Sequence, residues 1–120
     1  MASLPMVASG GKGLHWDTIE FASTANNDRI SGAFWVQDAT PYTTLKIGRV
    51  YTTASSIGGN KYFDVRNKIG GTHSDAVYSF QVTNSEQTFD ITNFTELSVG
   101  PDCTLSQAWK SFCFEDVSVY

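Results

Sequence analysis

Hydrophobic and polar residues alternate along most of the chain, in short runs separated by turn-forming residues. The clearest run is residues 75–82, where Ala76, Tyr78, Phe80 and Val82 fall on one side of an extended backbone. A period of two is typical of a strand with one buried face, and no window has the period of an amphipathic helix. The pattern predicts strands at residues 14–22, 29–37, 42–53, 61–66, 75–82, 88–92, 94–99 and 111–120.

Short strands joined by Gly-, Asn- and Asp-rich turns roughly every 8–12 residues are typical of an all-β sandwich or barrel. We expect an antiparallel β-sandwich of the jelly-roll type. A small up-and-down β-barrel is the alternative, because both folds alternate alike. A chain of 120 residues is of ordinary domain size, so residues 14–120 are expected to form a single domain. Residues 1–13 contain glycines that interrupt regular elements, which predicts a flexible N-terminal segment.

One predicted strand changes the face of its apolar residues at Gly48. Leu45 and Ile47 share one face of the strand, whereas Val50 falls on the other. A β-bulge at the glycine would keep all three side chains in the core, because one extra residue restores the phase of the alternation.

The closing stretch SFCFEDVSVY changes face in the same way. Strict alternation places its two apolar pairs on opposite faces: Phe112 with Phe114, and Val117 with Val119. A bulge at Glu115 and Asp116 would turn both pairs inward and leave the acidic residues at the bend.

The net charge of the chain argues against some classes of binding partner. Asp and Glu outnumber Lys and Arg by 12 to 8, which gives a net charge of −4, and the basic residues are scattered singly. Nucleic acid is therefore not expected as a partner, because phosphate binding needs a basic surface. Membrane insertion is not expected either, since no apolar run approaches the ~20 residues of a spanning helix. The N-terminus lacks the basic start and apolar core of an intact secretory signal.

The two cysteines leave two alternatives open. Cys103 and Cys113 can form a disulfide that ties the loop before the last strand to that strand, if the compartment is oxidising. They can equally be buried free thiols. Together with two histidines they are too few for a four-ligand zinc site of ordinary spacing.

Signals for catalysis are sparse. His73, Ser74 and Asp75 are consecutive, but side chains so close in sequence do not point at one another as a catalytic relay requires. The chain has no nucleophile elbow, phosphate loop or HExxH motif. We therefore expect no enzyme, with a small hydrolase as a minor alternative.

An outward aromatic cluster is the candidate binding site. A sugar ring needs a flat apolar face, with polar groups around it for the hydroxyls. Trp35 is expected to face away from the core, because its neighbours Phe34 and Val36 supply the core face. The predicted ligand-binding residues are Trp35, Asp38, Tyr42, Arg49 and Tyr51.

The ending FEDVSV resembles the last strand of jelly-roll carbohydrate-binding modules, which often close on an aromatic or aliphatic residue, an acidic pair and VSV. In that family, acidic residues near the chain ends help to hold a structural calcium ion. The resemblance implies a calcium site that contains Glu115 and Asp116. Because calcium needs more oxygen ligands than two carboxylates, Glu20 or Asp17 of the first long strand would have to join them.

These patterns predict a non-catalytic carbohydrate-binding protein, either a lectin or a carbohydrate-binding module, with a glycan as its partner. The alternative is a structural or interaction protein, such as a viral surface subunit or a secreted effector that binds another protein. A hydroxyl-rich surface with 17% charged residues suits an extracellular or surface-exposed place for both. A homo-oligomer is left open in either case.

Overall fold

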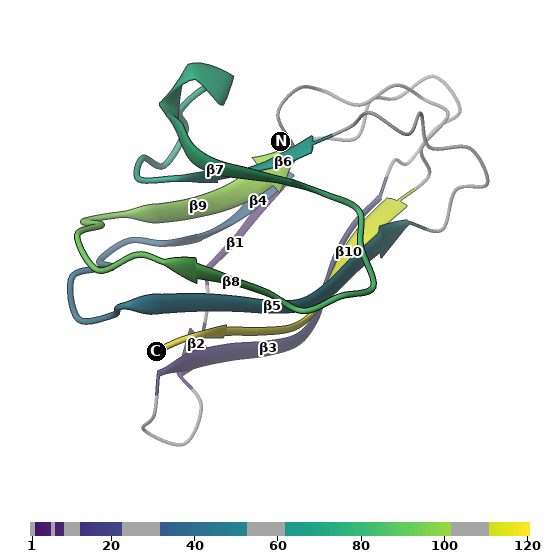
Figure 1. Cartoon of the computed structure of the whole chain (residues 1–120), viewed down its shortest axis with the longest axis horizontal. Helices are drawn as coiled ribbons and strands as arrows, with labels where there is room; N and C mark the ends of the chain where they lie inside the picture. Colours follow the sequence, from purple (N-terminus) through teal and green to yellow (C-terminus); the bar gives the residue numbers. More distant parts are fainter. Residues whose placement is uncertain (1, 6, 9–12, 23–31, 53–61, 102–110) are drawn as a thin grey trace.

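The computed structural model describes residues 2–5, 7–8, 13–22, 32–52, 62–101 and 111–120. Two five-stranded sheets pack face to face: sheet I has the order β1-β4-β9-β6-β7, and sheet II has the order β2-β3-β10-β5-β8 (Figure 1). The elements are β1 (Ala2–Pro5), β2 (Val7–Ala8), β3 (Leu14–Ala22), β4 (Gly32–Val36), β5 (Thr44–Thr52), β6 (Tyr62–Arg66), η1 (His73–Asp75), β7 (Ala76–Gln81), β8 (Gln87–Asp90), β9 (Leu97–Pro101) and β10 (Ser111–Val119).

The topology is that of a jelly roll. Setting aside the short strands β1 and β2, the orders β4-β9-β6-β7 and β3-β10-β5-β8 place the first and last long strands side by side. Among the described residues, neighbouring strands run antiparallel, apart from β1, which runs parallel to β4. The prediction of an all-β antiparallel sandwich is confirmed, and the sheets do not close into a barrel. No helix among the described residues is long and apolar enough to cross a membrane.

The N-terminal segment contributes backbone to both sheets. Residues 2–5 pair with β4, and residues 7–8 pair with β3. The flexibility expected for residues 1–13 stays a prediction, as does the single-domain organisation of residues 14–120.

Four phenylalanines hold the two sheets together. The ring of Phe63 lies 5.3 Å from the ring of Phe112 and 5.3 Å from that of Phe114. Phe114 in turn meets Phe34 edge to face at 5.2 Å. All four side chains are fully buried, and burial of each stabilises the fold by roughly 1.5–3 kcal/mol. The core therefore runs from β4 and β6 of sheet I to β10 of sheet II.

Strand β10 keeps its apolar residues in the core on both sides of its acidic pair. Asp116 has a φ of 54°, in the left-handed region, which reverses the phase of the alternation. Glu115 is half-buried and Asp116 is exposed on the outside of the sheet. The inward placement expected for the four apolar residues is confirmed, since each is buried: Phe112, Phe114, Val117 and Val119.

The pairing around this point is one-for-one, not that of a bulge. On β5, Arg49 is paired with Glu115 and Ile47 with Val117, so that Gly48 lies opposite the left-handed residue. Because neither strand has an extra residue, the β-bulges predicted separately for the two strands are replaced by one kink that both share.

Strand β3 takes part in the same kink. Its pairing with β10 is also one-for-one, with Thr18 opposite Glu115 and Trp16 opposite Val117. Ile19 and Trp16 pack in or against the core, while Asp17 and Thr18 between them are exposed. Two consecutive residues thus leave the core at the same level in three neighbouring strands, which bend together (Figure 1).

Candidate functional site

Polar side chains gather on the outer side of sheet II around the kink. We call this surface the kink face; among the described residues it comprises His15, Asp17, Thr18, Glu20, Lys46, Arg49, Tyr51, Cys113, Glu115, Asp116 and Ser118. The cluster is dense because β3 and β10 each turn two neighbouring polar side chains outward at the kink instead of one.

Arg49 and Glu115 form the central ion pair of the kink face. Arg49 Nε donates to Glu115 Oε2 at 2.8 Å, and Nη2 donates to Oε1 at 3.4 Å. The guanidinium also lies 4.2 Å from the centre of the Tyr51 ring, in a cation–π contact. The hydrogen bond from Arg49 holds the pKa of Glu115 below its usual value of 4.5, so this carboxylate stays charged in weak acid.

Lys46 forms a second ion pair, with Asp116, the other acidic residue of the kink in β10. Lys46 Nζ donates to Asp116 Oδ2 at 3.0 Å and lies 3.9 Å from Glu86 Oε1. The hydrogen bond to Asp116 raises the pKa of Lys46 above 10.5. On the edge nearer β2, the ring nitrogens of His15 lie 3.0 Å from Ser118 Oγ and 2.9 Å from Asp17 Oδ1.

Cys113 lies beside Glu20 at the end of the kink face farthest from His15 and Ser118. Its Sγ donates to Glu20 Oε2 at 3.3 Å, and burial raises the pKa of the thiol above 9.0. Cys113 is a free, buried thiol, which agrees with the second of the two alternatives for the cysteines. Cys103 lies outside the described residues.

The kink face carries more negative than positive charge. Among its described residues, four carboxylates face two permanent cations, and Glu86 adds a fifth carboxylate at its border. The side chain of Asp17 is 98% exposed and that of Asp116 is 57% exposed. An exposed acidic surface of this kind is complementary to a basic protein surface.

A second polar cluster lies on the outer side of sheet I, around one buried carboxylate. Asp64 of β6 is 0% exposed. Arg66 donates to its Oδ2 from Nη2 at 2.6 Å and from Nε at 3.2 Å. His73 Nδ1 lies 3.2 Å from both carboxylate oxygens, and Ser79 Oγ donates to Oδ1 at 3.2 Å. The buried charge is therefore paired with a cation and further hydrogen-bonded.

The Asp64 cluster fastens the loop of residues 67–75 to the sheet. Arg66 also donates from Nη1 to the carbonyl oxygen of Gly71. At the start of the loop, Asn67 Oδ1 accepts a hydrogen bond from the backbone N–H of Thr95 at 2.9 Å. These contacts connect a surface loop to β6 and to the segment before β9.

The same cluster lacks the parts of a hydrolytic relay. In such a relay, the carboxylate orients a histidine by a hydrogen bond, and the histidine is hydrogen-bonded to the nucleophile. Ser79 is bonded to Asp64 and not to His73, and the Ser74 hydroxyl is bonded to that of Thr72 at 2.7 Å. The geometry of the described residues supports a structural role for Asp64 and His73.

The predicted sugar-binding residues do not form one surface. Trp35 lies in β4 of sheet I, while Arg49 and Tyr51 lie in β5 of sheet II. Trp35 lies between the buried Phe34 and Val36, and Arg49 and Tyr51 lie on either side of the buried Val50. The three residues therefore face outward on opposite sides of the sandwich. Asp38 is in the loop after β4 and accepts hydrogen bonds from Thr40 at 2.6 and 3.1 Å. Tyr42, in the same loop, is partly buried against the core.

The three predicted calcium ligands have other partners. Glu115 accepts a hydrogen bond from Arg49, Asp116 accepts one from Lys46, and Glu20 accepts one from the Cys113 thiol. Among the described residues, no group of three or more His, Cys, Asp or Glu side chains is arranged to hold a metal ion. The structure thus gives the calcium expectation no ligand set in this part of the chain.

Sequence reasoning misses Asp64 and Lys46. Alternation places Asp64 on the outer side of β6, but it gives no sign that Arg66 and a loop cover it. Lys46 is one of the scattered basic residues, and its partner Asp116 is 70 positions away. An Asp followed two residues later by Arg, on the same face of a predicted strand, is the one local signal in the sequence that could have identified the Asp64 cluster.

No protein-family model matches the chain, and no curated protein matches it in sequence. Among solved structures, the fold is similar to that of Aeromonas hydrophila PliG, a periplasmic lysozyme inhibitor of g-type lysozyme. The TM-score is 0.59 at 11% identity, and the match covers 99% of this chain and 96% of PliG. At this identity the likeness shows a shared fold.

These findings correct the function predicted from the sequence. A lectin or carbohydrate-binding module with a glycan partner is contradicted, because the similar solved structure is an inhibitor of another protein. The physical reason agrees with this: the aromatic and polar residues of the expected sugar platform are divided between the two sides of the sandwich. Of the two predictions, the alternative, an interaction protein, agrees better with this likeness in fold.

Proposed function

We propose that this chain is a non-catalytic protein that binds another protein outside the cytoplasm, with enzymes of the lysozyme class as the first partners to test. The observation that carries the proposal is the full-length likeness in fold to an inhibitor of g-type lysozyme. An extracellular or periplasmic place is proposed on the same likeness.

The kink face is the docking surface that the described residues support best. It is acidic, it is built on three central strands of sheet II, and its side chains are held by ion pairs and hydrogen bonds. A preorganised surface loses less side-chain entropy on binding. Its negative charge would steer a basic partner and raise the association rate constant.

Calorimetry and a cell-wall lysis assay with a g-type lysozyme test this proposal, with lysozymes of other types for comparison. We expect saturable binding and loss of lysis. Substitution of the exposed Asp17 by Lys should lower the association rate constant several-fold, with a weaker effect at high salt. Thr92→Lys, which makes a smaller charge change in the turn after β8, should bind like the wild type. The absence of binding and of inhibition across the lysozymes would overturn the proposal.

A further inference from the structure

Strand β7 forms an outer edge of sheet I, and no described strand pairs with its outer side. Its six residues, Ala76–Gln81, include no charged residue and no proline. Natural sheets protect exposed edges with charged side chains, proline or very short strands, because an open edge readily pairs with another strand. β7 has none of these protections.

The other edges of the sandwich are each protected in one of these ways. β1 carries Pro5, and β2 is two residues long. β8 is four residues long, ends on Asp90 and follows Glu86. Within the described part of the chain, β7 is therefore the edge that is most open to pairing.

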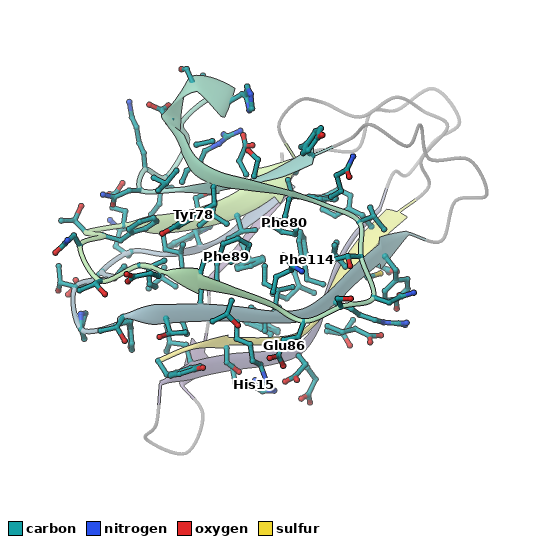
Figure 2. The ribbon with its side chains drawn as sticks, viewed as in Figure 1. His15, Tyr78, Phe80, Glu86, Phe89 and Phe114 are labelled. Carbon is teal, nitrogen blue, oxygen red and sulfur yellow. The ribbon has the colours of Figure 1, made fainter. Side chains whose placement is uncertain are left out.

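The inner side chains of β7 hold this edge in place. The Tyr78 hydroxyl donates to the carbonyl oxygen of Asp90 at 2.7 Å. The rings of Tyr78 and Phe80 lie 5.2 and 5.3 Å from the ring of Phe89, across the sandwich on β8 (Figure 2). Because the strand is already ordered, pairing with it loses little conformational entropy.

We propose that β7 pairs antiparallel with β7 of a second copy of this chain, about a two-fold axis at Ser79. Directly opposed residues of an antiparallel pair point to the same face of a sheet. This register places Tyr78 opposite Phe80 of the second copy on the inner face. It places Val77 opposite Gln81 of the second copy on the outer face. The two copies of sheet I then form one continuous sheet.

The exposed apolar residues favour a second copy as the occupant. The exposed large hydrophobic side chains of the described residues are Tyr62 at 41%, Val77 at 50% and Tyr120. Tyr62 is paired with Gln81 on the neighbouring strand, so the proposed register brings Val77 of the second copy to within one strand of Tyr62. Gln81 lies between the two residues, so they come to about 10 Å of each other on the same outer face. The two-fold axis repeats this arrangement on the other side.

The charge distribution is compatible with self-pairing. Each copy carries a net charge of −4, which opposes association in general. The run from Ala76 to Ser85 is uncharged, so no like charges meet along the paired strands. Edge pairing over six residues lies at the small end of specific interfaces, which bury about 1,200–2,000 Å². We therefore expect a reversible dimer.

Sedimentation equilibrium of the full chain tests the dimer between about 1 μM and about 1 mM. The mass should rise from 13.1 kDa towards twice that value. Val77→Lys should stay monomeric, because it places a charge in the uncharged interface. Gln37→Lys, with the same charge change in the exposed loop after β4, should dimerise like the wild type. A monomeric wild type, or a Val77→Lys variant that dimerises equally, would overturn the proposal.

A cross-link tests the register without relying on a loss of association. Opposed Cα atoms in antiparallel strands lie about 4.5–5.5 Å apart, within the range that a disulfide spans. In a Cys103→Ser background, Ser79→Cys should give a covalent dimer on oxidation and Gln37→Cys should not. Equal cross-linking of the two variants, or none with Ser79→Cys, rejects the two-fold at Ser79. Circular dichroism of each variant checks folding. Neither experiment uses a lysozyme, so its failure leaves the proposed function standing.

Discussion

Asp116 and Gly48 face each other across β10 and β5, and the backbone at Asp116 approaches so closely that position 48 must be a glycine. Asp116 is in the left-handed region, with a φ of 54°. A Cβ atom on Gly48 would lie 2.8 Å from Asp116 Cβ and 2.8 Å from the carbonyl oxygen of Glu115. The close approach at the kink thus depends on the missing side chain of the glycine.

Replacing Gly48 by Ala should destabilise the protein by about 1–3 kcal/mol, because the new methyl group overlaps backbone that two strands hold in place. Urea unfolding measures the change. The double variant Gly48→Ala/Asp116→Gly should lose less than the sum of the two single variants, since it removes the Asp116 side-chain atoms that the methyl group meets and leaves only the carbonyl oxygen of Glu115. Strict additivity would show that the two positions are not coupled.

Replacing Asp64 by Asn should cost about 3 kcal/mol of stability, because it leaves Arg66 without its buried counter-charge. Amide hydrogen exchange should also increase in residues 67–75, which the cluster fastens to the sheet. Asp38→Asn is the matched control: this carboxylate is exposed, and its loss should change stability far less. If the two variants are equally stable, the Asp64 cluster does not hold the loop.

Stability should fall on acidification, in part through Glu115. The pKa of Glu115 is lower in the folded state than its usual 4.5, chiefly because Arg49 hydrogen-bonds to the carboxylate. A lowered folded pKa contributes stability above the unfolded pKa, and this is lost as the pH falls through the folded pKa. A series of melting temperatures from neutral pH down to about pH 2 should decline more gently below 4.5 in Arg49→Gln. Parallel curves would assign the acid sensitivity to other carboxylates, such as Asp38, Asp75 and Asp90, whose pKa values are also lowered by hydrogen bonds.

The Cys113 thiol should react slowly in the folded protein. Burial raises its pKa above 9.0, and the thiolate is the reactive form. In a Cys103→Ser variant, which leaves one thiol, a colorimetric disulfide reagent at pH 8 should react at least ~10-fold faster in urea than in buffer. Equal rates in the two solvents would show that the thiol is open to solvent.

Much of the fold could be predicted from the sequence, because alternation reports directly on which side of a strand is buried. Residues 75–82 illustrate this: β7 runs over Ala76–Gln81, with Phe80 in the core. The inward placement of Phe112 and Val119 was equally predictable. The kink itself was not, because a phase change within one strand gives no information about whether its neighbours change at the same level.

The candidate site was less predictable, because it depends on which outer surface each residue occupies. Alternation assigns Trp35 and Arg49 to outer faces, but it does not show that these faces belong to different sheets. The partners of the acidic pair are also distant in sequence, at Lys46 and Arg49. The prediction of a sugar-binding function failed for the same reason. Its residues were grouped because their side chains suit a sugar site, without knowledge of where each one lies in the fold.

The shared kink also fixes the alignment of the strands that contain it. A plain alternating strand can slide by two residues along its neighbour and keep every side chain on its proper face. Such a slide of β10 along β5 would bring Asp116 opposite Lys46 or Val50 in place of Gly48, against a side chain that leaves no room. The kink therefore fixes the register of β10 against its neighbours, and it disfavours the shifted registers that hydrophobic patterning alone would permit.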